Sequence, residues 1–376
     1  MHLTRPTAAI IDLDALSFNL RSARDFLGTG TEIMAVVKAN AYGHGAVECS
    51  RRLKAEGVER LAVAIVEEAA ELRDAGVAGD ILILGGIWPE QAELTLKYGL
   101  TPAIFRLESA EALNSLSIGR ETRTKIHIKI DTGMGRVGVP LADAAEFARA
   151  IARLENLEVE GLMTHFSSAD DLGQSDFTNF QMDRFGSVVE TFANEGIRPP
   201  ILDLANSPAS VAFPRSRSGL VRLGGILYGL GGDVLPDVPQ PALMPVMSVT
   251  SEVGFVKKVA AGDSLGYGRT FTAERDSIIA TVPVGYADGY PRMLSNKGTM
   301  IVAGQVAPVV GRVSMDWTIL DVTNIPNVEV GTKVTVIGAD GEDRILAEDL
   351  AAACDTISYE ITCGFSARVP RLFKSS

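Results

Sequence analysis

The sequence contains few of the residues that build metal sites and disulfide frameworks. It has 376 residues but only four histidines and three cysteines, Cys49, Cys354 and Cys363. No two cysteines form a CxxC pair, which argues against both a zinc site and a disulfide scaffold. We therefore predict a protein without a bound metal, from a reducing compartment.

Excess positive charge and long apolar runs are also lacking. The net charge of -12 argues against non-specific binding to nucleic acid or to anionic membranes. No apolar run approaches the length of a membrane span, and the N-terminus has acidic residues where a signal peptide would be apolar. These absences predict a cytoplasmic protein that holds anionic ligands with local cations and backbone N–H groups.

What the sequence does have is a regular alternation of strand-like and helical segments. Strand-length apolar runs begin at Ile33, Arg60, Ile81, Thr101, Lys125, Leu157, Ile201 and Leu220. Eight strand–helix units in roughly 200 to 230 residues match a parallel (β/α)8 barrel of the TIM type. A doubly wound open sheet also alternates in this way, but eight units can close, and closure removes the exposed sheet edges.

The pattern changes at the proline-rich stretch 236–245, which suits neither a helix nor a central strand. Beyond it most apolar residues recur with a period of two, and only residues 346–355 are expected to form a helix. We predict a barrel over residues 1–240 and a smaller, mainly antiparallel β domain over residues 241–376.

Chemically capable residues follow the ends of several predicted strands, where barrel enzymes build their active sites. The set comprises Lys38, Asn40, Tyr42, Lys129, Asp131, Arg136, His165, Asn206, Ser207, Arg222, Gly224 and Gly225. A lysine at one strand end, with a hydroxyl and a glycine pair suited to phosphate, indicates pyridoxal phosphate or a sugar phosphate attacked by a Schiff-base lysine. A lysine that merely reaches solvent is the simpler alternative.

Nine motifs resemble, in order and spacing, those of the alanine racemase family. They are AVVKANAYGHG, KIDTGMGRVG, HF at His165, ANSPAS, VRLGG, GYGRTF, VGYADGYPR, GRVSMD and SYEITCG. The resemblance extends from about Thr7 to the C-terminus, and the motifs beyond residue 260 are the most specific, since single-domain relatives lack that region. It implies a pyridoxal-phosphate enzyme that interconverts L- and D-alanine as a homodimer. Each active site would combine one subunit's barrel mouth with the other subunit's β domain.

The resemblance also implies two acid–base groups, Lys38 on one face of the substrate and Tyr267 from the partner subunit on the other. Racemisation requires two such groups, because one group would mostly return the proton to the face it came from. Lys38 would also carry the cofactor. A histidine matching His165 would bond both the tyrosine and Arg222, and the neighbouring positive charge would lower the tyrosine pKa. A packed interface aromatic is the alternative for Tyr267.

Further roles follow from positions that match the family. Arg222 would face the pyridine nitrogen and leave it unprotonated, because arginine keeps its own protons; a salt-bridged rim arginine is the alternative. The cofactor phosphate would be held by Tyr42, Ser207, Tyr359 and the backbone at Gly224 and Gly225. The substrate carboxylate would meet the Arg136 side chain and the Met315 backbone N–H of the partner subunit. Gly225 departs from the family, which usually has an aliphatic residue there, and Asn206 is either a neighbour of the site or a turn former.

The predicted strand KIHIKID poses a separate problem. Its isoleucines should face the helices, which turns Lys129 towards the barrel interior near Arg136. Two adjacent buried cations are costly. Family members with a lysine here suggest carbamylation of Lys129, which would create an anion for Arg136 to bind; ordinary pairing with Asp131 is the alternative.

Three competing functions belong to the same cofactor class. They are a broader amino-acid racemase, an amino-acid decarboxylase and a non-catalytic pyridoxal-phosphate carrier. A decarboxylase should hold the pyridine nitrogen with a carboxylate and carry a cysteine-bearing loop in the second domain, and neither is evident. A carrier usually consists of the barrel alone, and broad-specificity racemases are often exported. The sequence is compatible with D-alanine supply for peptidoglycan and with alanine breakdown.

Overall fold

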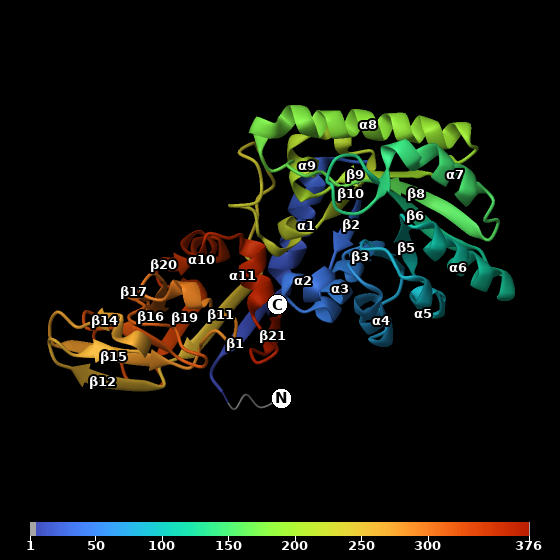
Figure 1. Ribbon diagram of the computed structural model, residues 1–376. Helices are drawn as coiled ribbons and strands as arrows, with labels where there is room; N and C mark the ends of the chain where they lie inside the picture. The colour runs from blue at the N-terminus through green and yellow to red at the C-terminus, as the bar shows by residue number, and fades with distance from the viewer. Residues whose placement is uncertain (1–4, 376) are drawn as a thin grey trace.

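Eight parallel strands close into a barrel in the first part of the chain (Figure 1). The computed structural model describes residues 5–375. The barrel strands are β2 (Glu32–Val36), β3 (Arg60–Val63), β4 (Asp80–Ile83), β5 (Thr101–Ile104), β6 (Thr124–Asp131), β8 (Leu157–Met163), β9 (Ile201–Ala205) and β10 (Gly219–Leu223). Because β10 pairs with β2 and β5 pairs with β6, the ring is complete. The predicted barrel is confirmed and the open sheet is excluded.

Helices cover the outside of the ring. They are α3 (Ala46–Ala55), α4 (Val66–Asp74), α5 (Ala92–Lys97), α6 (Leu107–Gly119), α7 (Ala144–Ala152), α8 (Ser175–Asn194) and α9 (Ser207–Ala212). Helix α1 (Leu13–Leu27) precedes the first barrel strand, yet it packs against α3 and against the 3-10 helix η5 (Gly225–Tyr228) that follows the last one. It therefore completes the helical layer where β10 meets β2.

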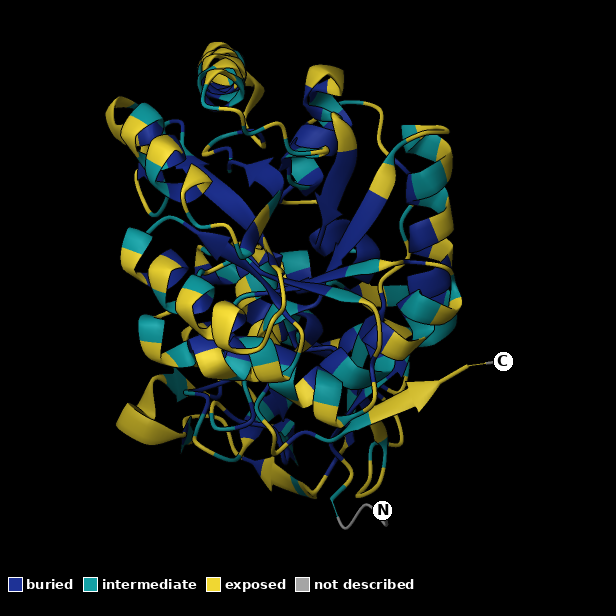
Figure 2. Cartoon of the chain, turned by 90° about the vertical axis from the view of Figure 1, so that its right-hand side faces the viewer, coloured by how far each residue is buried: buried dark blue, intermediate teal, exposed yellow. Residues whose placement is uncertain are grey.

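Residue type decides which side of a barrel strand is apolar. In β6, Ile126, Ile128 and Ile130 are buried in the large apolar core shared with the helices. His127 and Lys129 alternate with them and are also buried. The sequence prediction that these polar residues face the barrel interior agrees with this packing. Figure 2 shows buried strands at the centre and helices with exposed outer faces.

The second domain is mostly antiparallel, as predicted, and the stretch 236–245 forms neither helix nor strand. Its longer strands are β11 (Met247–Glu252), β12 (Phe255–Val259), β15 (Ser277–Val282), β16 (Thr299–Val302), β17 (Gln305–Pro308), β18 (Thr318–Asp321) and β19 (Lys333–Asp340). A short hairpin of β13 (Ser264–Leu265) and β14 (Phe271–Thr272) carries Tyr267 in its turn. The ends of the chain join this domain: β1 (Ala8–Asp12) pairs with β11 and with β21 (Arg371–Lys374). The division at residue 240 stays a prediction, and the first strand lies in the sheet of the second domain.

The expectation of a single helix in the second domain was wrong. Besides α10 (Ala347–Cys354), residues Ser358–Gly364 form the helix α11. The Ser358 backbone N–H and hydroxyl donate to Asp233 at 2.6 and 2.8 Å, and α11 packs against the turn that follows β2. Contacts with distant residues, rather than local periodicity, stabilise this short helix. No helix among residues 5–375 is both long enough and apolar enough to cross a membrane.

Candidate active site

The structure brings most of the predicted site residues to one end of the barrel. Lys38 follows β2, Lys129 lies on β6, His165 follows β8 and Arg222 lies on β10. These groups influence one another electrostatically, because Arg222 and Arg136 both act on the amines of Lys38 and Lys129 and on the imidazole of His165. The clustering at the carboxyl ends of the strands is the arrangement that barrel enzymes use for catalysis.

The backbone directly after Lys38 is strained. In α2 (Lys38–Tyr42), Ala39, Asn40, Ala41 and Tyr42 all have φ between 51 and 54°. The left-handed conformation costs roughly 1–2 kcal/mol for each L-residue, and such strain concentrates at functional sites.

Neighbouring side chains hold this left-handed turn in place. Glu68 accepts hydrogen bonds from the backbone N–H groups of Ala39 and Ala64 at 2.6 and 2.7 Å. Nδ1 of His44 lies 2.9 Å from the carbonyl oxygens of both Ala41 and Tyr42, so Nδ1 carries the proton. The turn gives the Lys38 side chain a fixed backbone from which to extend.

Lys38 has the electrostatic setting of a reactive amine. Burial lowers its pKa, and the nearby charges of Arg136 and Arg222 lower it further. A lowered pKa raises the fraction of free amine at neutral pH, which is the nucleophilic form. A lysine that merely reaches solvent would not be surrounded by two arginines.

Arg222 is the central buried cation of the site, with 3% of its surface exposed. Its guanidinium forms an ion pair with Asp203 and donates to the carbonyl oxygens of Thr164 and Leu204 at 3.0 and 3.3 Å. It also lies 3.4 Å from Nδ1 of His165. Asp203 was missed in the sequence, although an acidic residue inside the apolar run ILDLA was the available signal.

These contacts define the protonation of His165. A guanidinium can only donate, so Nδ1 of His165 accepts and its proton sits on Nε2. Burial, followed by the charges of Arg222 and Lys129, holds the His165 pKa well below its ordinary value. The neutral imidazole thus presents an Nε2–H donor on the side away from Arg222.

Lys129 sits among cations without an anionic partner. Burial lowers its pKa to about 8, and Arg222, Arg136 and Lys38 act in the same direction. Within residues 5–375 it has no ion pair, while Asp131 uses a carboxylate oxygen to accept the backbone N–H groups of Gly133 and Gly135 at 2.9 and 3.1 Å. The alternative of a Lys129–Asp131 pair is therefore not seen.

The glycines after β10 lie against three hydroxyl groups. The Gly224 N–H donates to Oγ of Ser207 at 3.0 Å. A Cβ at Gly224 would lie 2.3 Å from the Tyr42 hydroxyl, and one at Gly225 would lie 2.2 Å from the Tyr359 hydroxyl. Burial raises the pKa of both tyrosines, so their hydroxyls stay protonated and able to donate. Neutral hydroxyl donors beside a glycine backbone without side chains are suited to a phosphate group.

The other predicted residues lie elsewhere. Asn206 caps helix α9, where its side chain accepts the Ala209 N–H at 3.1 Å, as a turn former would. Tyr267 and Met315 belong to the second domain, with 72% and 52% of their surfaces exposed. In Figure 1, strand β14 beside Tyr267 lies at the outer edge of the second domain, far from the barrel strands. One chain alone therefore does not bring Tyr267 to Lys38.

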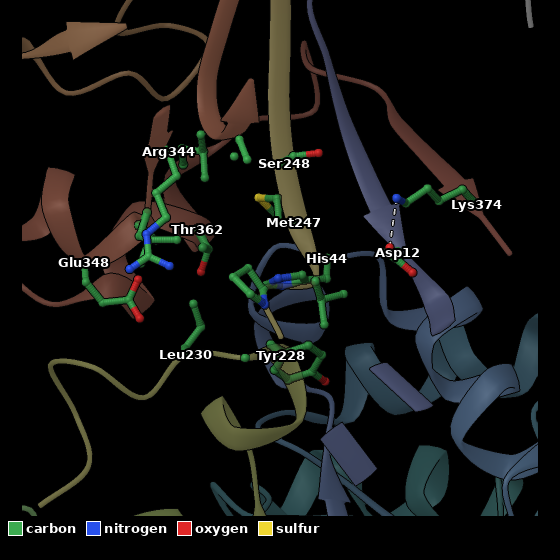
Figure 3. A pocket seen from close by; sticks show the side chains of 18 residues that line it. Asp12, His44, Tyr228, Leu230, Met247, Ser248, Arg344, Glu348, Thr362 and Lys374 are labelled. Carbon is green, nitrogen blue, oxygen red and sulfur yellow. Dashed lines mark ion pairs between the residues drawn. The ribbon is translucent and has the colours of Figure 1, made fainter. Parts of the chain in front are cut away.

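A separate cavity of about 320 Å3 lies between the barrel and the second domain (Figure 3). Its lining includes His44, Tyr228, Met247 and Arg344, but none of the predicted site residues. Because none of the predicted site residues lines it, we do not assign the cavity to the active site.

A closed barrel with a lysine of lowered pKa after its first strand, followed by an antiparallel β domain, defines a two-domain barrel enzyme. Residues 11–231 match the family model for the alanine racemase N-terminal domain, and residues 246–373 match the one for the alanine racemase C-terminal domain. The chain belongs to the alanine racemase family and is an isomerase.

Individual relatives agree with this assignment. The chain is 45% identical over 375 residues to an alanine racemase of Halothermothrix orenii, covering 99% of this chain and 98% of that protein. It superposes on the crystal structure of alanine racemase from Streptomyces lavendulae with a TM-score of 0.93 at 34% identity, covering 100% of this chain and 98% of that one. For alanine racemase from Bartonella henselae with covalently bound pyridoxal phosphate, the TM-score is 0.87 at 30% identity, covering 98% and 99%.

Proposed function

We propose that this protein racemises alanine with pyridoxal phosphate, using Lys38 and Tyr267 of the partner subunit as acid–base groups on opposite faces of the substrate. The observation that carries the proposal is the low-pKa amine of Lys38 at the barrel mouth, beside Arg222 and after the strand next to the one that leads into Gly224 and Gly225.

The residues at the barrel mouth fit the cofactor. The Lys38 amine would hold its aldehyde carbon. The hydroxyls of Tyr42, Ser207 and Tyr359, together with the backbone at Gly224 and Gly225, would hold its phosphate. Arg222, which stays charged, would face the ring nitrogen. When bound, pyridoxal phosphate supplies an electron sink for the substrate's Cα.

The protein's own groups would then move the proton. Lys38 would exchange a proton at Cα on one face, and its lowered pKa makes the free amine available near neutral pH. On the other face, the Nε2–H of His165 would donate to the oxygen of the partner's Tyr267. Such a donor favours tyrosinate and lowers the pKa of a tyrosine, which is ordinarily about 10. Arg136 would meet the substrate carboxylate.

A homodimer with shared active sites follows from the same proposal. The exposure of Tyr267 and Met315, and their place in the second domain, support a role on a neighbouring subunit. Backbone bonds of Tyr286 and Ala287 to the 314–315 segment, each 3.0 Å long, keep this surface ordered. A cytoplasmic location stays a prediction from the sequence.

Carbamylation of Lys129 is part of the proposal. The free amine would attack CO2, forming an N–C bond and releasing one proton to water. The buried position, the pKa of about 8 and the three surrounding cations support it, because a carbamate anion would neutralise Arg136 and Arg222. Carbon-13 NMR with labelled bicarbonate should show a carbamate signal that Lys129→Gln lacks. A free amine at saturating CO2 would refute it.

Incubating the purified holoenzyme with L-alanine in D2O tests the main proposal. Deuterium should appear at Cα of both enantiomers. Tyr267→Phe should slow racemisation at least about 100-fold, the usual contribution of a general acid–base group, and leave exchange in one enantiomer only. Release of CO2 would instead indicate a decarboxylase. If the wild-type protein catalysed neither racemisation nor CO2 release, the remaining candidate would be a non-catalytic pyridoxal-phosphate carrier.

A further inference from the structure

The buried carboxylate of Asp203 has no place in the proposed mechanism so far. It lies on β9, it is wholly buried, and one of its oxygens pairs with Arg222. Its other oxygen, Oδ2, has no hydrogen-bond partner among the described residues. A buried ion pair in which one carboxylate oxygen lacks a hydrogen bond contributes little to folding stability. We therefore look for a functional role for Asp203.

The groups around Asp203 come from three other strands of the barrel. Arg222 approaches from β10, and His127 and Lys129 act on Asp203 from β6. On β8 the residue in register is Met163, which does not titrate, and His165 lies two residues further along. Burial raises the pKa of Asp203, whereas the charge of Arg222 opposes that rise and favours the carboxylate form. Asp203 is the carboxylate that forms an ion pair with Arg222.

The contacts of Arg222 show how Asp203 acts on the site. The carbonyl groups of Asp203, Thr164 and Leu204 and the Asp203 carboxylate accept from the guanidinium, and among residues 5–375 His165 is the one further side chain with a polar contact to it. Because the guanidinium is planar, a charged partner on one edge fixes the direction of the other edge.

We propose that Asp203 is a positioning residue for the racemase reaction: its ion pair with Arg222 orients the guanidinium towards His165 and adds a negative charge to the cationic cluster. This inference rests on the proposed function. Without the charge of Asp203, the cluster of Lys38, Lys129, Arg136 and Arg222 would be more positive. Protonation of Lys38 and His165 would then become harder.

Asp203→Asn tests the proposal because asparagine keeps the shape and one acceptor oxygen but removes the charge. The kcat should fall about tenfold to a hundredfold, as expected for a displaced positioning group. The acidic limb of the pH profile of kcat/KM should move to lower pH. The pH titration of the bound cofactor's absorption, which does not depend on turnover, should move in the same direction.

Two further variants separate charge from packing. Asp203→Glu keeps the charge, so the pH profile should stay near that of the wild type even if kcat falls. Glu160→Gln is the matched control, because Glu160 is a buried barrel carboxylate that pairs with Lys125 and Arg60 at 2.9 and 3.3 Å. It should lower stability and leave both pH titrations unchanged.

The proposal is overturned if a folded Asp203→Asn protein keeps the wild-type kcat and both wild-type titrations. Should that variant fail to fold, Asp203→Ser, which is smaller and also neutral, takes its place. If both neutral variants fail while Asp203→Glu folds, the charge serves folding and the positioning role is wrong. If the wild type does not racemise alanine, the proposed function falls, whereas the cofactor titration still tests Asp203.

Discussion

At the scale of single residues, the glycine pair after β10 shows how closely backbone and side chain are fitted. Gly225 has a negative φ, which any residue can adopt. Glycine is needed here because there is no room for a side chain. A methyl group there would lie 2.2 Å from the Tyr359 hydroxyl, at the end of a rigid ring that is itself packed against Tyr42 with 5.0 Å between ring centroids.

Gly225→Ala should therefore weaken cofactor binding. Overpacking costs about 1–3 kcal/mol, which corresponds to roughly a tenfold to hundredfold rise in the dissociation constant for pyridoxal phosphate. Absorbance titration of the cofactor-free protein measures this constant. Gly186→Ala in α8 is the control, since nothing lies within 4 Å of the added methyl group. It should gain about 0.5–1 kcal/mol of stability. Unchanged cofactor affinity in Gly225→Ala would mean that Tyr359 moves freely.

Among the elements, the left-handed turn after β2 carries a cost that a single substitution can relieve. Ala39 is exposed and has φ 51°. Ala39→Gly relieves roughly 1–2 kcal/mol of backbone strain in the folded state. Glycine also increases the entropy of the unfolded chain, which lowers stability by about 0.5–1 kcal/mol. The variant should thus be more stable by up to about 1 kcal/mol in chemical denaturation. Ala352→Gly, at an exposed position in α10, should show the opposite sign, with a loss of about 0.5–1 kcal/mol. A loss in both variants would contradict the assignment of strain to the turn.

Glu160 on β8 lies close to three basic side chains. Its carboxylate lies 2.9 Å from Lys125, 3.3 Å from Arg60 and 3.5 Å from His127. His127 lowers the Glu160 pKa most, and Lys125 and Arg60 lower it further, so that the three together outweigh burial and hold it at about 2, below the ordinary 4.5.

The pKa of Glu160 predicts how stability responds to acid. A carboxyl group whose pKa is lowered by folding stabilises the protein fully above its unfolded pKa, and this contribution is lost as pH falls from about 4.5 to about 2. The melting temperature of Glu160→Gln should be lower than that of the wild type at pH 7 but should fall less between pH 5 and pH 3. Scanning calorimetry of both proteins measures this difference. Parallel pH dependence in the two proteins would show that Glu160 is not held by its cations.

For the whole molecule, the proposed sharing of active sites between subunits makes a quantitative prediction. Lys38→Ala and Tyr267→Phe should each be nearly inactive alone. In a heterodimer of the two, one site combines the intact Lys38 of one chain with the intact Tyr267 of the other. Random reassociation after mixing should therefore restore about a quarter of the wild-type sites. No recovery, in a mixture shown to contain heterodimers, would mean that each site is built from one chain.

Much of this architecture was predictable because it depends on local pattern. The eight apolar runs, the proline-rich break and the residues at strand ends all follow from side-chain periodicity and chain stiffness, which each segment carries on its own. The site positions from Lys38 to Tyr359 were recognisable for the same reason, since short motifs hold them at constant spacing.

Other features were decided only by tertiary structure. Strand β1 lies far in sequence from β11 and β21, and α11 depends on a bond to Asp233, so neither shows in local periodicity. The left-handed turn is stabilised by Glu68, which lies 29 residues from Ala39 along the chain. In the sequence, Asp203 is an acidic residue within an otherwise apolar strand. Its ion pair with Arg222 forms only when the barrel closes. The sequence by itself determined which residues could react. Their pKa values and partners arose when the barrel excluded water from charges that are distant along the chain.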